Sequence, residues 1–286
     1  MPEKNVKYDI RIFLVITFGG GILLSLVVAA AGGHTGRLYN LSYLSMLIPG
    51  IAVWVLQVMK QPLIQTTFGP PPLPWVLVAI LIFPVLIHAA YIPVFVLQNN
   101  GHVPWQPWLT PGNDGLYRSP AEKGWGTITG SSLVFHITVN AIVGLVIVSF
   151  LALFEEIGWR CWLLPRLIVR FNVRIGILAT AITAALWHMP FMASGVQYIS
   201  GAPLPLEMGL YMLGQTGAAI IIGWLWLKTH NLWIAALAHG SLNNWGQYAF
   251  KYMSDAAPGG QTIALMAALN IALLIAGLTV LFCLEN

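Results

Sequence analysis

The chain has 286 residues, of which 58% are hydrophobic and only 8% are charged, with a mean hydropathy of +0.78 and a formal net charge of +4. A soluble domain carries about 25% charged residues, so this composition excludes a soluble enzyme and predicts an all-α, polytopic membrane protein. The small positive charge fits contact with anionic lipid better than binding of a nucleic acid.

Apolar segments long enough to span a membrane recur along the chain about eight times. We predict helices at about 12 to 32, 41 to 59, 74 to 97, 132 to 154, 175 to 190, 208 to 227, 231 to 250 and 262 to 283. The fifth and seventh are short or carry polar residues. No internal repeat and no flexible linker divides the sequence, so a single transmembrane domain over 1–286 is expected.

The first predicted helix follows Lys4, Lys7 and Arg11 and ends near three alanines, as a secretory signal peptide does. Its apolar run is longer than the roughly 7 to 15 residues of a signal-peptide core, so we expect an uncleaved helix. The polar interruption at about 98 to 130 is rich in proline and tryptophan, which predicts an ordered interfacial loop that acts as a connector.

Lysine and arginine residues are distributed unevenly between the two sets of loops. The amino terminus and the second, fourth and sixth loops hold nine, and the other side holds four. The nine are Lys4, Lys7, Arg11, Lys60, Arg160, Arg166, Arg170, Arg174 and Lys228, and the four are Arg37, Arg118, Lys123 and Lys251. The positive-inside rule therefore predicts both termini in the cytosol, with the segment from about 155 to 174 at the cytosolic end of the fourth helix.

The two cysteines give no disulfide framework. Cys161 and Cys283 are both expected in or beside the membrane on the cytosolic side, where thiols stay reduced. Packing is their expected role.

Glu155, Glu156 and Arg160 interrupt an otherwise apolar segment. An ionised side chain at bilayer depth costs about 2.5 to 3.5 kcal/mol even on lenient scales, so such a cluster indicates function. Glu156 and Arg160 are four residues apart and share one face of a helix, which allows an ion pair. Glu155 points in another direction, so we expect it to face a cavity, where a carboxyl group can act as a base or an acid.

Two further polar clusters follow, each in its own apolar segment. His239 and Asn243 are four residues apart and can supply two hydrogen-bond donors to one oxyanion. His188 lies two residues before Pro190, which frees backbone groups, so we expect the fifth helix to break there and admit water. Lone histidines elsewhere are assigned to hydrogen bonds between helices, namely His88 and His136.

Taken in order, the motifs Glu-Glu-x-x-Trp-Arg, Trp-His-x-Pro and His-x-x-x-Asn resemble those of the CPBP intramembrane glutamic proteases. That family includes the CAAX prenyl endopeptidases and the bacteriocin-immunity (Abi) proteins. The resemblance covers about 150 to 250, which we expect to be the catalytic core. Many members have phenylalanine four residues before the middle histidine, where this chain has Ala184, and Trp187 is expected to supply the aromatic packing instead.

The resemblance implies an endopeptidase that works inside the membrane with no metal or other cofactor. Glu155 would activate a water molecule, with His188 helping to hold it. His239 and Asn243 would stabilise the oxyanion, and Glu156 with Arg160 would form the supporting ion pair. The chemistry of the residues agrees, because a carboxylate can take a proton from water and return it to the leaving amine.

Alternatives from other classes stay open at this point. Two histidines and a glutamate could form a zinc site, although the sequence has no His-Glu-x-x-His run. Cys161 beside Arg160 is a weaker candidate nucleophile, because no histidine is close in sequence. A transporter would also use buried acids, but no inverted repeat is apparent. A bacteriocin-immunity or scaffold protein could carry the same residues without proteolysis.

The expected partners are a peptide or lipidated-protein substrate, with prenylated tails as one class, and membrane lipid. No nucleic acid is expected. The expected location is the cell membrane, with the active site opening toward the cytosolic side. The sequence specifies neither the physiological substrate nor the oligomeric state.

Overall fold

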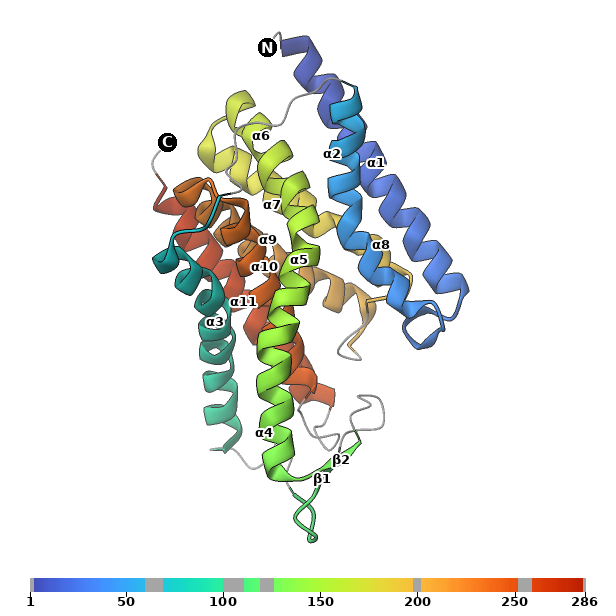
Figure 1. Cartoon of the computed structure of the whole chain (residues 1–286), viewed down its shortest axis with the longest axis vertical. Helices are drawn as coiled ribbons and strands as arrows, with labels where there is room; N and C mark the ends of the chain where they lie inside the picture. Colours follow the sequence, from blue (N-terminus) through green and yellow to red (C-terminus); the bar gives the residue numbers. More distant parts are fainter. Residues whose placement is uncertain are drawn as a thin grey trace.

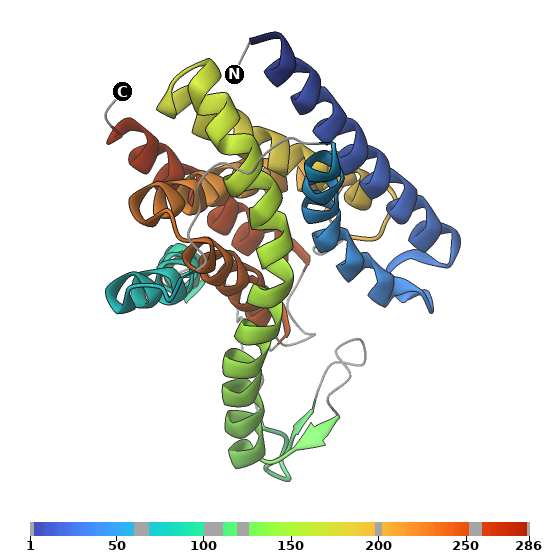
Figure 2. The same ribbon diagram turned by 45° about the horizontal axis from the view of Figure 1, so that its top comes forward.

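The computed structural model describes residues 3–59, 69–99, 111–118, 126–197, 202–251 and 259–284. These residues form a bundle of long helices (Figure 1, Figure 2), which confirms the predicted all-α, polytopic class. Seven segments of the described chain are long and apolar enough to cross a membrane: Asp9–Ala30, Tyr39–Val58, Leu73–Val94, Gly130–Arg170, Val173–Ala193, Leu204–Thr229 and Ile263–Phe282.

The elements in the first half of the chain are the helices α1 (Glu3–Ala30), α2 (Ile48–Val58) and α3 (Leu73–Asn99), with the 3-10 turns η1 (Gly33–Thr35) and η2 (Tyr39–Leu47) before α2. A short antiparallel pair, β1 (Tyr117–Arg118) and β2 (Thr127–Ile128), precedes the fourth long helix. Beside β1, the Arg118 guanidinium contacts the exposed Asp114 carboxyl and lowers its pKa to about 2. Most of the predicted 98 to 130 loop lies outside the described residues.

The second half holds the elements that carry the motifs. The fourth long helix is made of α4 (Gly130–Val139), η4 (Asn140–Gly144), α5 (Leu145–Glu156), η5 (Ile157–Leu163) and α6 (Leu164–Arg170). It is followed by α7 (Val173–Trp187), α8 (Met189–Ala193), α9 (Leu204–Thr229), α10 (Leu232–Lys251) and α11 (Gly259–Phe282). The predicted seventh span corresponds to α10, which has 20 residues but is less hydrophobic than the other seven because of polar side chains at 239 to 244.

The structure corrects the predicted end of the fourth helix. The sequence predicted an end at 154, with Glu155 close to the cytosol, but the helix runs for 41 residues through Arg170. The charged residues do not end it, because they find partners inside the bundle. Two stretches, η4 and η5, are π-helical, and η5 begins directly after Glu156. Such stretches are frequent at functional sites.

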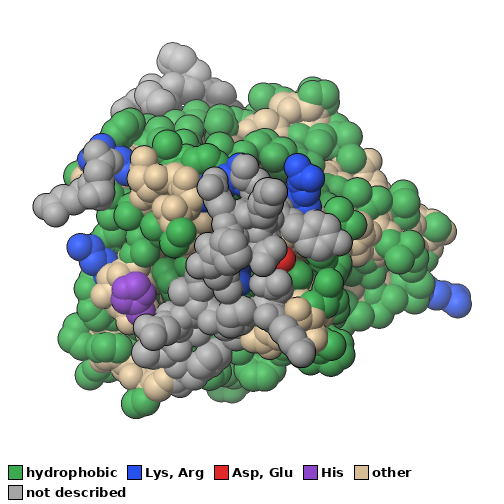
Figure 3. Space-filling model, turned by 90° about the horizontal axis from the view of Figure 1, so that it is seen from above, with side chains coloured by type: hydrophobic (Ala, Val, Ile, Leu, Met, Phe, Trp, Pro, Cys, Tyr) green, Lys and Arg blue, Asp and Glu red, His purple; other side chains and the backbone are tan. Residues whose placement is uncertain are grey.

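Both chain termini lie at the same end of the bundle (Figure 1). Figure 3 shows this end, where lysine and arginine side chains are scattered over a mostly apolar surface. Basic residues toward this end are Arg11, Arg166, Arg170, Arg174 and Lys228, whereas Arg37 and Arg118 lie in connections at the other end. The asymmetry agrees with the positive-inside pattern, and the cytosolic orientation of the termini stays a prediction.

The helices pack around two apolar clusters. One is formed by α3, α6, α7, α9, α10 and α11, and the other by α1, α2, η5, α6, α7 and α8. Glycines allow the closest approaches, because a Cβ on Gly217 of α9 would lie 2.1 Å from the backbone oxygen of Leu273, and one on Gly240 of α10 would lie 2.1 Å from Ser149 Oγ. Small residues are the usual means of tight helix contact in a membrane, where lipid tails are as apolar as the helices.

Candidate active site

Glu156, the last residue of α5, is the centre of a buried polar cluster. Its Oε1 accepts hydrogen bonds from Arg160 Nη1 at 2.9 Å and from His239 Nδ1 at 2.7 Å. Arg160 Nη2 also donates to the backbone oxygen of Ala219 on α9, at 3.0 Å. The predicted ion pair between Glu156 and Arg160 is therefore confirmed. It joins the long fourth helix to α9 and α10.

The contact with Glu156 fixes the orientation of His239. A carboxylate can only accept, so Nδ1 is the donor and Nε2 is the ring nitrogen that is left for another partner. The side chains of Glu156 and Arg160 are 0% and 3% exposed. A buried charge of this kind requires a compensating partner, which each of them supplies to the other.

Glu155 points to a different side of the helix from Glu156, as its spacing predicted. Its Oε2 accepts a hydrogen bond of 3.3 Å from the indole Nε1 of Trp159, and the residue is 2% exposed. The Glu155 carboxylate is also coupled electrostatically to His239. Trp159 thus holds one carboxylate oxygen and leaves the other for the cavity beside it.

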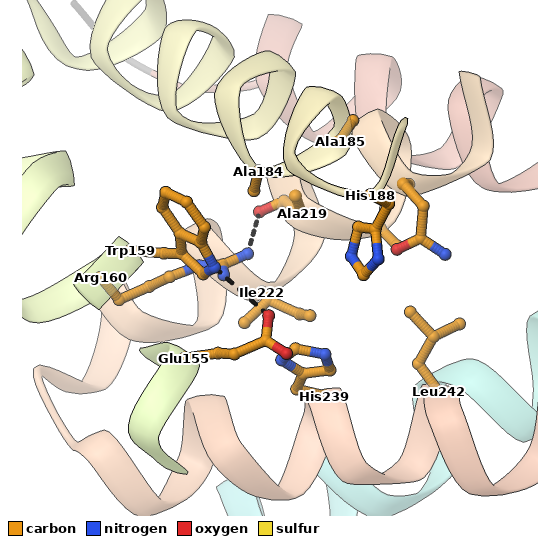
Figure 4. A pocket seen from close by; sticks show the side chains of 12 residues that line it. Glu155, Trp159, Arg160, Ala184, Ala185, His188, Ala219, Ile222, His239 and Leu242 are labelled. Carbon is orange, nitrogen blue, oxygen red and sulfur yellow. Dashed lines mark hydrogen bonds between the residues drawn. The ribbon is translucent and has the colours of Figure 1, made fainter. Parts of the chain in front are cut away.

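A cavity of about 20 Å³ lies between α5, η5, α7, α9 and α10 (Figure 4). Glu155, Arg160, His188 and His239 line it, and Figure 4 shows Glu155 beside His239, with His188 across from them. The rest of the lining is largely apolar, with Ala184, Ala185, Ala218, Ala219, Ile222 and Leu242. A space of this size holds about one water molecule, and its polar groups could hydrogen-bond to that water.

His188 lies where α7 ends and α8 begins, with Pro190 in the first turn of α8, so the predicted break in the helix is confirmed. Its ring packs edge-on against Trp187 at 5.1 Å and against Tyr211 of α9 at 5.4 Å. Trp187 therefore supplies the aromatic packing expected of it. Ala184 lines the cavity, where a phenylalanine would take up space.

Asn243 is half-buried on α10, one helical turn after His239, and does not line the cavity. Four of the predicted residues therefore line one cavity: Glu155, Arg160, His188 and His239. Glu156 contacts two of them, Arg160 and His239, and Asn243 is not among the lining residues. The role expected for Asn243 at the oxyanion stays a prediction.

Three residues beside the site were given no role from the sequence: Trp159, which is the tryptophan of the Glu-Glu-x-x-Trp-Arg motif, Tyr211 and Gln215. The spacing of four residues between Glu155 and Trp159 was a signal that could have identified Trp159 as a partner. Tyr211 and Gln215 belong to α9, whose sequence carries no charged motif near them. Their contact with the site comes from the way α9 crosses the bundle.

The two rival chemistries can be compared with this geometry. In the part of the chain that the structure describes, no group of three histidine, cysteine, aspartate or glutamate side chains has an arrangement that could hold a metal ion, and chelation tests the zinc alternative directly. Cys161 is buried and lines a separate apolar cavity of about 340 Å³ with Trp54 and Phe154. That location gives no support to Cys161 as a nucleophile paired with His188 or His239.

Comparison with known proteins points to the same part of the chain. A family model described as type II CAAX prenyl endopeptidase Rce1-like matches residues 137–245. All six residues predicted from the motifs fall in this range. A search of curated proteins finds no significant match.

Proposed function

We propose that this chain is an intramembrane endopeptidase in which Glu155 activates water, because a family model of type II CAAX prenyl endopeptidases matches residues 137–245. The observation that carries this proposal is the cavity of about 20 Å³, where Glu155 and His188 border a space for one water molecule. The proposed substrates are peptides or lipidated proteins held at the membrane, prenylated tails among them. The end with both termini is proposed to face the cytosol.

In the proposed reaction Glu155 takes a proton from the water while the water oxygen bonds to the scissile carbonyl carbon. His188 orients the water from the other side of the cavity. The tetrahedral intermediate that forms carries an oxyanion. Glu155 then passes its proton to the leaving amine as the carbon–nitrogen bond breaks, and the carboxylate is regenerated.

The oxyanion needs donors that are already in place. In its protonated form, His239 can donate from Nε2 to the oxyanion while Nδ1 keeps its hydrogen bond to Glu156. Asn243 is proposed as a second donor, which requires the cavity to extend along α10 when substrate enters. Glu156 and Arg160 act on the reaction by fixing the ring of His239, and their burial limits its movement.

The test is cleavage of a quenched-fluorescent farnesylated CAAX peptide, and of the same peptide without the farnesyl group, by purified protein in detergent. Wild type should cleave in the presence of a strong zinc chelator, and Glu155→Gln should lose about 10² to 10⁴ in rate, the range for a general base. The control is Asp114→Asn, which changes an exposed residue just before β1, and this variant should cleave the peptide at the wild-type rate.

Each other outcome has a definite meaning. Full activity in Glu155→Gln would contradict the glutamate mechanism. Loss of cleavage on chelation would replace it with a zinc mechanism. Cleavage of the unmodified peptide at the same rate would remove prenylation from the recognised features.

A further inference from the structure

One face of α1 packs against the aromatic side chains that border the active site. Asp9, Phe13, Thr17 and Gly21 recur every four residues and so share a face of the helix. The first three are 3%, 0% and 0% exposed. This face lies outside residues 137–245, the part of the chain that matches the protease family.

Phe13 holds the indole that binds Glu155. Its ring stacks on Trp162, with centroids 4.7 Å apart, and meets Trp159 edge-on at 5.6 Å. The Nε1 of Trp159 donates to Glu155 Oε2. Phe13 therefore packs directly against the indole whose N–H binds Glu155.

Thr17 and Gly21 hold the indole that packs on His188. Trp187 Nε1 donates a hydrogen bond of 3.3 Å to the backbone oxygen of Thr17. Gly21 lies against the same nitrogen so closely that a Cβ there would be 2.9 Å from it. Trp187 in turn packs edge-on against His188 at 5.1 Å.

The beginning of this α1 face is attached to the same helix as Glu155. Asp9 is coupled electrostatically to Arg166 of α6, and both residues are 3% exposed. The Arg166 guanidinium lies over the Trp162 ring, 4.1 Å from its centroid. The interaction between Asp9 and Arg166 thus joins α1 to α6 one turn before Phe13.

We infer that α1 is a positioning element of the active site, in which Phe13 acts on Glu155 through Trp159, and the backbone at Thr17 and Gly21 acts on His188 through Trp187. The inference rests on the function proposed above for Glu155 and His188. If α1 only packed against the bundle, changes on this face would alter stability and leave the turnover number unchanged. Displacing a group that orients the reaction by about 1 Å can cost roughly a hundredfold in rate.

The sharpest test compares two identical substitutions on α1, Gly21→Ala and Gly19→Ala. Both replace a helical glycine by alanine, but the new Cβ pushes on Trp187 only at Gly21, because nothing lies within 4 Å at Gly19. We expect kcat of Gly21→Ala to fall at least about tenfold with KM within about twofold, and Gly19→Ala to match wild type. Equal kcat values for the two variants would overturn the inference.

Phe13→Leu tests the other arm, because leucine keeps an apolar side chain but removes the ring that packs on Trp159. We expect kcat to fall about tenfold at unchanged KM. Val15→Leu, at a position that is 71% exposed on α1, is the control and should leave kcat unchanged. A normal kcat in a folded Phe13→Leu protein would remove Phe13 from the positioning element.

A second measurement does not depend on proteolysis. The imidazole proton resonances of His188 can be assigned by NMR with a His188→Gln variant, and the ring current of Trp187 acts on them at this distance. They should shift in Gly21→Ala and not in Gly19→Ala. An unchanged His188 signal in Gly21→Ala overturns the inference, and an absence of peptide cleavage by wild type contradicts only the proposed function.

Discussion

Replacing either of the two adjacent glutamates by glutamine should have a different effect on the free energy of unfolding. Glu156 Oε1 accepts from Arg160 and His239 at 2.9 and 2.7 Å, and its side chain is fully buried. Glu156→Gln removes the charge that compensates Arg160. Breaking a buried ion pair from one side lowers the free energy of unfolding by about 3 to 5 kcal/mol.

Glu155→Gln leaves that ion pair intact. The glutamine oxygen can still accept the hydrogen bond from Trp159, whose net contribution is about 1 kcal/mol. The substitution also removes a buried carboxylate that has no ion-pair partner of its own among the described salt bridges. We expect a free energy of unfolding within about 1 kcal/mol of wild type, or above it, together with loss of cleavage.

Thermal unfolding in detergent, followed by tryptophan fluorescence, measures the difference. A shift of about 2 to 4 °C per kcal/mol predicts a Tm lower by roughly 6 to 20 °C for Glu156→Gln and by no more than roughly 4 °C for Glu155→Gln. The reasoning is refuted if both variants lose the same Tm, or if Glu156→Gln unfolds at the wild-type temperature.

Two further predictions concern packing and the exposed loop. Gly240→Ala should lower the free energy of unfolding by about 1 to 3 kcal/mol, because its Cβ would lie 2.1 Å from Ser149 Oγ and 2.7 Å from the Ser149 backbone. Gly246→Ala on the same helix has nothing within 4 Å and should unfold no more readily than wild type. Because Arg118 lowers the pKa of Asp114 from 3.8 to about 2, the stabilisation from this pair should be complete above the ordinary pKa and lost as pH falls through about 2. An NMR titration of Asp114 checks this, and a midpoint near 3.8 would contradict it.

Composition and spacing predicted the parts of this structure that depend on local rules. The apolar runs located the membrane helices, and the interval of four residues predicted the pair between Glu156 and Arg160. The predicted end of the fourth helix was wrong for a physical reason. A charged residue ends an apolar run in the sequence. Inside the bundle, however, His239, which is 83 residues from Glu156, hydrogen-bonds to Glu156, and the backbone oxygen of Ala219 accepts from Arg160.

Only some of the residues that form the site could be predicted from the sequence. Periodicity places His239 and Asn243 on one face of α10, but it does not determine how far along that face the cavity extends. Tyr211 packs on His188 from α9, and Phe13 packs on Trp159 from α1. Contacts of this kind join residues that have no common motif, so they appear only when the helices are assembled.

The length of the fourth helix links the protein to the thickness of its bilayer. At about 1.5 Å per residue, its 41 residues extend roughly 60 Å, twice the hydrocarbon core of about 30 Å. An ordinary tilt of about 20° shortens that height by only a few ångströms. Phe135, Ile142 and Val146 in its first half are more than half exposed, so lipid would have to thicken around them, or the bundle would have to lean, to keep them from water. Hydrophobic mismatch therefore acts on the same helix that carries Glu155.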